Sequence, residues 1–510
     1  MRFTFFILLS IFLTGSLIAQ VPEDALRYSW MRQKGTARNQ AVGGAMGSLG
    51  GDITATFVNP AGLGLYKTGE FVLSPGFKFF NNNSQYRESS ASAKDNAFNF
   101  GTSGFVLGFG NNSRKWKGSA ISIAVNRTAS FNNNIYYKGQ NDLSSYSEQY
   151  AEELANSRIP VERAFDDNSL SLGTRMALYT YLIDTATING VKQIIGLPEL
   201  LGSRDQENRI QTTGGITEIS LGAAGNMDDK FYVGGSIGLP IVNYERTNTF
   251  TETDPSGNTN NNFNRSTLRE VYTTKGLGLN AKFGIIFKPV DLVRVGLAVH
   301  TPTIYGLKDT YTADMTTDTE NYPPSPGLVD VSSDVLTGNQ LTQYEYDMVS
   351  PWKIMLSGSY VFREVEDVTR QRGFISADVE FVNHKSSSFS SAGSTSDDNY
   401  YDGINSTIDD IYKSTINVRL GGELKFNTFM ARGGFSYYGN PYTDSELKAR
   451  QMFISGGLGY RNKGFFVDFT YVHGLLRDVN FPYRLSDKAN TFAEVKGSSG
   501  NVLMTFGFKF

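Results

Sequence analysis

The sequence predicts an all-β protein, a transmembrane antiparallel β-barrel of about fourteen strands. Three observations support this fold class. Apolar and polar residues alternate along many segments after Glu70, aromatic residues make up 13% of the 510 residues, and the chain carries 53 glycines. Alternation with period two is typical of a strand with one apolar face. Aromatic and glycine residues are frequent in the girdles and turns of barrels.

The last strand, NVLMTFGFKF, shows the alternation most clearly. Its apolar face carries Val502, Met504, Phe506, Phe508 and Phe510. Residues 292–300, 373–384, 414–426 and 464–474 repeat the design, with Arg, Lys, Asp and Glu only on the opposite face. A soluble β-sandwich would give the same local alternation. Strands of about ten to thirteen residues and an export signal favour a membrane barrel with a charged lumen.

We count about fourteen such segments, an even number as in bacterial single-chain barrels. They are residues 70–80, 98–110, 116–127, 214–226, 230–246, 268–288, 292–300, 352–362, 373–384, 414–426, 428–438, 451–461, 464–474 and 499–510. Short turns are expected at 111–115, 226–230, 288–291, 363–372, 426–428 and 461–463. Long loops are expected at 81–97, 128–213, 247–267, 301–351, 385–413, 439–450 and 475–498. This asymmetry predicts that the long loops lie outside the cell.

The first residues, 1–19, have the pattern of a secretory signal peptide. Arg2 precedes an apolar run from Phe3 to about Leu17, and Ala19 is a suitable cleavage site. The run is short for a membrane anchor, and no later run of about twenty apolar residues occurs. The chain has no Cys, so neither disulfides nor a cysteine-linked lipid are expected. Export together with a barrel predicts the outer membrane of a Gram-negative bacterium.

The loop at 128–213 contains apolar segments that predict short amphipathic helices: YSEQYAEELANS, LSLGTRMALYTYLIDTA and KQIIGLPELLG. In the first, Tyr146, Tyr150 and Leu154 are four residues apart and share one helical face. These helices could pack on one another as a cap, or they could form an apolar groove for a hydrophobic ligand at the barrel mouth. The two interpretations are compatible.

Several function classes find no support in the sequence. The net charge of −3 gives no basic field for nucleic acid. The three histidines, at positions 300, 384 and 473, lack metal-ligand spacing, and no G-x-S-x-G motif suggests a lipase. GAMGSLG at 44–50 has neither a preceding strand nor the lysine of a phosphate loop. We therefore expect no enzyme activity and no cofactor.

The segment before the first strand carries the most specific motif. It reads GTARNQAVGGAMGSLGGDITATFVNPAGL, and it resembles the start of the FadL/TodX family of outer-membrane transporters for long-chain fatty acids and other hydrophobic compounds. The matching residues are Gly35, Ala37, Gly43, Gly44, Ala45, Gly50, Asp52, Ala55, Asn59, Pro60 and Ala61. HTPT at 300–303, SPW at 350–352, YYGNP at 437–441 and the terminal Phe510 extend the resemblance over most of the chain.

The resemblance implies a hatch at residues 20–69 that plugs a barrel at residues 70–510. It also implies passive transport, in which a ligand captured by the loops enters the barrel, shifts the hatch and leaves sideways into the membrane. The hatch residues expected to matter are Gly43, Gly44, Gly50, Gly51, Asp52, Asn59, Pro60 and Ala61. Asn59-Pro60-Ala61 could equally be an ordinary stable turn.

A ligand carboxylate would favour a cation in the lumen. The inward-facing candidates are Lys282, Arg294, Arg419 and Arg432. Alternatively, these cations form an acid–base ladder with Asp378, Glu380, Glu423 and Asp468. The expected partners are a fatty acid or hydrocarbon, outer-membrane lipids and, through Phe510, the barrel assembly machinery, with the chain a monomer. A surface receptor or adhesin that binds without transport is the alternative function.

Overall fold

The structure is a computed structural model that describes residues 22–110, 115–188, 190–323, 326–362, 372–393, 398–444, 447 and 449–510. The expected signal peptide, the 111–114 part of one turn and most of the 363–372 turn lie outside these residues. The helices are α1 (Pro22–Ser29), α2 (Ala37–Ala41), η1 (Ile53–Thr56), η2 (Pro60–Leu65), α3 (Glu148–Ser157), α4 (Val161–Ala164), α5 (Leu172–Tyr179), η3 (Leu197–Leu200), α6 (Ser333–Leu336), η5 (His384–Ser386) and α7 (Asp398–Ile411).

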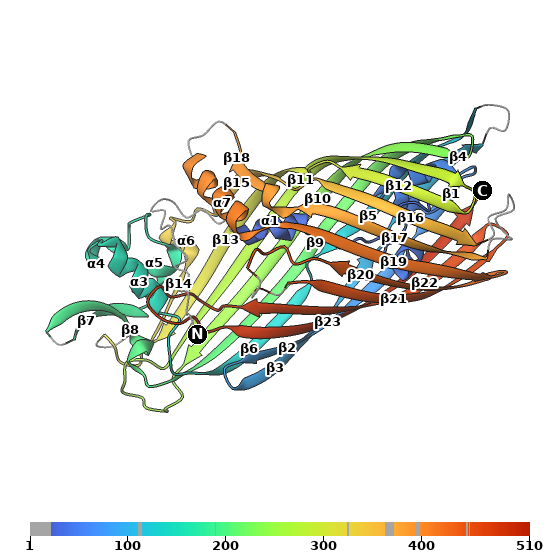
Figure 1. The fold of residues 1–510 in the computed structure, drawn as a ribbon. Helices are drawn as coiled ribbons and strands as arrows, with labels where there is room; N and C mark the ends of the chain where they lie inside the picture. The colour runs from blue at the N-terminus through green and yellow to red at the C-terminus, as the bar shows by residue number, and fades with distance from the viewer. Residues whose placement is uncertain are drawn as a thin grey trace, which may run out of the picture.

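One antiparallel sheet closes on itself and forms the barrel (Figure 1). Eight of its strands are continuous: β9 (Arg204–Met227), β10 (Phe231–Thr253), β11 (Arg265–Val290), β19 (Ser414–Phe426), β20 (Phe429–Tyr438), β21 (Gln451–Asn462), β22 (Phe465–Asn480) and β23 (Ala493–Lys509). Six more are each broken into two segments: β1 (Glu70–Leu73) with β2 (Pro75–Tyr86), β3 (Ser89–Phe100) with β4 (Ser103–Gly110), β5 (Trp116–Ser130) with β6 (Asn133–Asn141), β12 (Val293–His300) with β13 (Ile304–Asp318), β15 (Thr342–Val349) with β16 (Lys353–Phe362), and β17 (Gly373–Asn383) with β18 (Ser388–Ser391). The predicted fourteen-stranded antiparallel barrel is therefore confirmed.

The outer face of the barrel carries a belt of exposed apolar side chains, as the alternation predicted. On β23, Met504, Phe506 and Phe508 are exposed, while Leu503 and Thr505 are buried between them. A belt of this kind suits contact with lipid hydrocarbon. No helix in the described part of the chain is both long and apolar enough to cross a bilayer.

The strands extend well beyond the belt, and here several loop predictions are wrong. On β10 the exposed apolar residues end at Ile241, but the strand continues to Thr253 with the exposed polar residues Asn243 and Glu245. About half of region 247–267 and most of region 301–351 are consequently strand. The expected long loop at 81–97 is a tight hairpin, since β2 ends at Tyr86 and β3 begins at Ser89.

A cap, residues 142–203, covers the end of the barrel where the strands extend (Figure 1). It contains α3 to α5, the hairpin β7 (Ile183–Ile188) with β8 (Val191–Gly196), and η3. Its apolar core also includes Phe250, Leu268 and Met315 from the extended wall, with β14 (Leu328–Ser332) alongside. The prediction of a helix at 192–202 is wrong. Its β-branched residues pair as a strand with β7, and Pro198 confines the helical part to one 3₁₀ turn.

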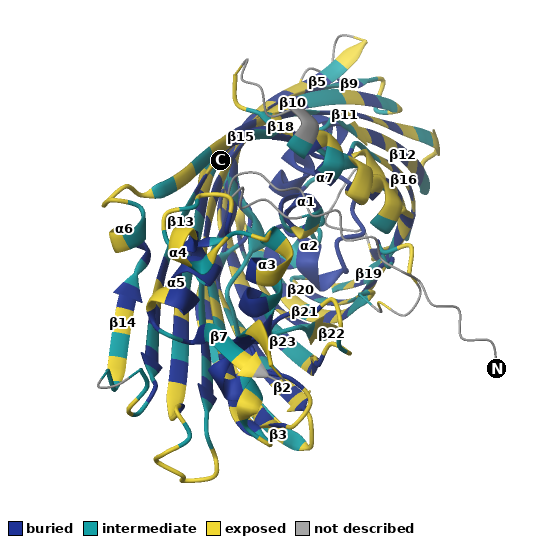
Figure 2. Cartoon of the chain, turned by 90° about the vertical axis from the view of Figure 1, so that its left-hand side faces the viewer, coloured by how far each residue is buried: buried dark blue, intermediate teal, exposed yellow. Residues whose placement is uncertain are grey.

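The N-terminal segment, residues 22–69, lies within the ring of strands (Figure 2). Its backbone is held by inward side chains of opposite parts of the wall. Thr470 of β22 donates a hydrogen bond to the Ala37 carbonyl (2.8 Å), and Ser236 of β10 donates one to the Thr56 carbonyl (2.8 Å). At the other end of the segment, α1 packs with α7 in an aromatic cluster. The segment therefore extends through the barrel, from its contacts with β10 and β22 to α1, which lies under the cap.

Candidate functional site

Asn59 joins the N-terminal segment to the wall. Its amide nitrogen donates hydrogen bonds to the Gly47 carbonyl (2.6 Å) and to the Ile285 carbonyl of β11 (3.3 Å). Its Oδ1 accepts from the Ala61 amide (3.2 Å) and caps η2, and Pro60 at the first helical position lacks the N–H that would need a partner. The triplet is thus a helix start and a wall contact at once.

Asp52 organises the neighbouring turn in the same way. One of its carboxylate oxygens accepts from the Thr36 hydroxyl (2.6 Å), and the other accepts from the Thr54 amide (2.9 Å) at the start of η1. These bonds tie η1 to the start of α2, which Thr36 caps. Asp52 is consequently a bracing residue within the segment.

The four glycines predicted for the hatch all have positive φ. They are Gly43, Gly44, Gly50 and Gly51. Gly43 has φ +67°, and a Cβ there would lie 2.8 Å from the Phe435 carbonyl oxygen of β20. Glycine at this position therefore permits both the left-handed turn and the close approach of the segment to the wall.

Each lumen cation predicted for ligand binding already has a protein partner. Arg432 pairs with Glu423 and Asp468, both at 2.6 Å, and Arg419 pairs with Glu380 at 3.3 Å. Lys282 pairs with Glu218. These contacts form the acid–base ladder that the sequence offered as the alternative.

Two further contacts extend this ladder to the N-terminal segment. The Arg294 guanidinium donates to the Leu49 carbonyl (2.7 Å), and Arg38 pairs with Glu423 (3.2 Å). The wall cations therefore position the segment within the barrel.

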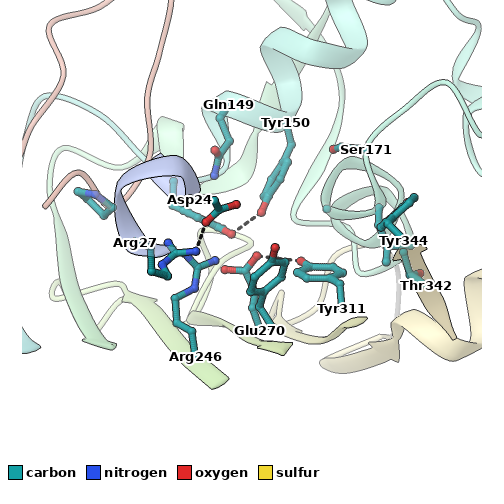
Figure 3. Close-up of a pocket in the computed structure, with 15 residues that line it drawn as sticks. Asp24, Arg27, Gln149, Tyr150, Ser171, Arg246, Glu270, Tyr311, Thr342 and Tyr344 are labelled. Atoms are coloured by element: carbon teal, nitrogen blue, oxygen red, sulfur yellow. Dashed lines mark hydrogen bonds and ion pairs between the residues drawn. The ribbon is translucent and has the colours of Figure 1, made fainter. Parts of the chain in front are cut away.

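Under the cap, a cavity of about 420 Å³ lies between α1, α3, α5 and the extended strands (Figure 3). Tyr146 and Tyr150 line it, as the sequence predicted for a ligand groove, whereas Leu154 is fully buried in the cap core. The remaining lining is aromatic and charged rather than aliphatic. It includes Asp24, Arg27, Arg246, Glu270, Tyr272, Tyr311 and Tyr344. Sequence reasoning missed these residues because they come from distant segments with no shared motif.

The polar side chains that line the cavity include hydrogen-bond donors and acceptors. Tyr311 donates to Glu270 (2.8 Å), and the Nε of Arg246 has no partner among the described residues. Burial raises the pKa of Tyr150, and burial together with Glu270 raises that of Tyr311, so both phenols remain protonated donors. An aromatic or amphipathic molecule suits this cavity better than a purely aliphatic chain.

Among the described residues, the hydrogen-bonded wall is interrupted between the strand formed by β3 and β4 and the strand formed by β5 and β6. The ladder between β4 and β5 runs from Gly110–Gly118 up to Ser103–Val125 and stops there. Beyond Ser103 and Val125, within the described residues, β3 forms a ladder with β2 alone and β6 forms a ladder with β9 alone. We call this missing ladder, between residues 89–100 and 126–141, the wall break.

At the wall break, β6 shifts to the inner face of β2. Asn82 of β2 donates 2.6 Å hydrogen bonds to the Asn133 side chain and to the Asn134 carbonyl. Side chains rather than a backbone ladder therefore join this part of the wall. Residues 81–97 were predicted as a loop, so the sequence reasoning could not locate the break.

The overall fold is similar to that of a solved FadL homologue. A Pseudomonas aeruginosa FadL homologue aligns over 94% of this chain and 99% of its own, with 13% identity and a TM-score of 0.51. The Ralstonia pickettii toluene transporter TbuX (15% identity, 94% and 99% coverage, TM-score 0.48) and the P. putida toluene transporter TodX (12% identity, 94% and 99% coverage, TM-score 0.49) also align. No family model and no curated protein sequence matches the chain. At this level of identity the likeness is one of fold, and the chain has the fold of a FadL-type barrel.

Proposed function

We propose that this chain is an outer-membrane channel that passively carries hydrophobic or amphipathic small molecules. The observation that carries the proposal is the wall break, which lies in an otherwise continuous barrel beside the N-terminal segment. An apolar ligand that leaves through the wall stays out of water, which is worth about 0.8 kcal/mol per CH₂ group. A concentration gradient is a sufficient driving force.

The proposed path has three stages. A ligand binds first in the cavity under the cap, where tyrosines supply apolar faces and hydrogen-bond donors. It then enters the lumen. Because the N-terminal segment lies there, the segment must change position to let the ligand pass, and so acts as the hatch. Finally it leaves between β3 and β5 into the membrane, at the end of the break beside Phe98, where the outer face is still apolar. Long-chain fatty acids and aromatic hydrocarbons are the substrate classes to test, since the cavity offers aromatic faces together with polar groups.

Uptake in cells that lack their own transporter tests the function directly. Cells that express the chain should accumulate radiolabelled oleate or toluene faster than cells with an empty vector. The protein must first be detected in the outer membrane. Binding to the purified protein without any gain in uptake would favour the alternative, a surface receptor.

The chain has no cysteine, so a single engineered cysteine can probe the exit. Val125→Cys places a half-buried thiol at the edge of the wall break, and Lys275→Cys places one on the exposed outer face of β11, away from the break. A bulky maleimide on Val125→Cys should block uptake, and the same reagent on Lys275→Cys should not. Equal uptake after complete labelling of both variants would argue against exit at the break.

A further inference from the structure

Lys34 in the N-terminal segment is a buried cation without a partner. Its side chain is 6% exposed, and its ammonium makes no hydrogen bond or ion pair. Among the described residues it is the one lysine with a buried, unbonded ammonium. A buried ammonium without a partner is costly, so the Lys34 amine favours its neutral form until an anion binds beside it.

The charges around Lys34 are also positive. Arg32, Lys78 and Arg127 are the charged groups that act on it, and burial and these neighbours lower the pKa of Lys34 well below its usual range. None of these four residues, the cation cluster, forms an ion pair in the described structure. Arg32 lies over the Phe453 ring (4.4 Å) and Lys78 over the Phe80 ring (3.9 Å).

This arrangement contrasts with the rest of the lumen. Arg419, Arg432 and Lys282 are equally buried, and each faces a carboxylate. Cations that serve only the architecture are therefore neutralised in this barrel. The cation cluster lacks the negative charge that its setting requires, and an anionic ligand would supply it.

The cluster lies at the inner side of the wall break. The Gly35 carbonyl packs against Gly101, where a Cβ would lie 2.2 Å from its oxygen, and Gly101 separates β3 from β4 at the lower corner of the break. Lys78 faces inward on β2 opposite Ala97 of β3.

The other edge of the break contributes the remaining cation. Arg127 lies two residues after Val125, the last residue of β5 in the ladder with β4. Its guanidinium donates a hydrogen bond to the Thr217 hydroxyl (3.0 Å). Outside the break, Phe77 and Phe98 are exposed on the outer faces of β2 and β3. Positive charge inside and aromatic surface outside match a molecule with an anionic head and an apolar tail.

We propose that Lys34, with Lys78 and Arg127, holds the carboxylate of a single-chain amphiphile at the inner side of the wall break. This site rests on the proposed function, because the ligand reaches it along the proposed path. The site makes the exit selective for anionic ligands, because a neutral hydrocarbon gains no binding free energy from the cation cluster. The headgroup phosphate of a membrane lipid has similar chemistry and is the competing source of the anion.

The test compares a charged ligand with a neutral one of the same tail. Full-length wild type and Lys34→Met, purified in detergent, are titrated with oleate and with oleyl alcohol. Lys34→Met should lose at least about tenfold in affinity for oleate and keep its affinity for oleyl alcohol. Lys275→Met, on the exposed outer face of β11 away from the break, is the matched control and should bind both ligands as wild type does.

Further measurements distinguish a fatty acid site from a phospholipid site and from a folding defect. Heat-modified migration in gels reports whether Lys34→Met is folded, and Lys78→Met provides a second variant on the wall. Unchanged oleate affinity in both variants, or equal loss of oleate and oleyl alcohol, would overturn the site. A co-purified phospholipid that disappears from native mass spectra of Lys34→Met, with oleate binding unchanged, would assign the cluster to membrane lipid instead. Selective oleate binding without uptake would leave the site intact and overturn the transport proposal.

Discussion

Asn59 fits against the barrel wall because the facing residue on β11, Gly284, has no side chain. A Cβ at Gly284 would lie 1.8 Å from the Asn59 Oδ1. The wall glycine and the buried asparagine thus form one joint between the N-terminal segment and β11. Either partner can be changed, and the two changes should have related effects on gating.

Asn59→Ala should leave the barrel assembled and loosen the N-terminal segment. The substitution removes the η2 cap and two donated hydrogen bonds, which together stabilise the segment by about 1 to 3 kcal/mol. Single-channel recordings in planar bilayers should show more frequent opening than in wild type. Asn59→Asp keeps the capping oxygen and separates the two contributions. Unchanged conductance and uptake in Asn59→Ala would show that the motif is an ordinary turn without a role in gating.

Gly284→Ala tests the same joint from the wall side. The new methyl group cannot coexist with the observed Asn59 position, so the asparagine must shift and its bond to Ile285 must lengthen or break. We expect the gating change of Asn59→Ala, measured by the same recordings. Gly358→Ala on β16 is the control, because a Cβ there meets nothing within 4 Å. A double variant no more open than either single variant would show that both act through one contact.

The outer surface of the barrel could be predicted from sequence, while most of the candidate site could not. Residues such as Ile416 and Leu420 alternate with polar or charged residues and mark a lipid-facing strand locally. Beyond Ile241 the outer face meets water, so the polar residues 247–249 resemble a loop although the ladder continues. Lys34 carries no local signal, because its surroundings are set by the fold, which brings Lys78 and Arg127 to it from distant segments.

Arg432→Met should be among the more damaging single substitutions in the wall. The substitution leaves Asp468 buried without its ion-pair partner and removes an ion pair of Glu423. We expect the free energy of unfolding to fall by about 3 to 5 kcal/mol. Unfolding by urea from lipid vesicles measures this loss. Lys308→Met removes the exposed pair with Glu345 (3.3 Å) on the extended wall, and it should cost less than about 1 kcal/mol. Similar costs for the two variants would show that the buried ladder contributes no more than a surface pair.

The cap should lose stability only at strongly alkaline pH. Burial, with a hydrogen bond to Asp184 of β7, raises the pKa of Tyr322 to about 12, and burial also raises the pKa of Tyr150 and Tyr311. An unfolded tyrosine ionises near pH 10, so above about that pH the unfolded cap releases protons that the folded cap retains. Between neutral pH and about pH 10 the tyrosines should leave stability unchanged, and it should fall as the pH rises toward 12. Proteolysis of the cap across this range measures the fall. Tyr322→Phe should make it shallower, and a fall that begins near neutral pH would contradict this assignment.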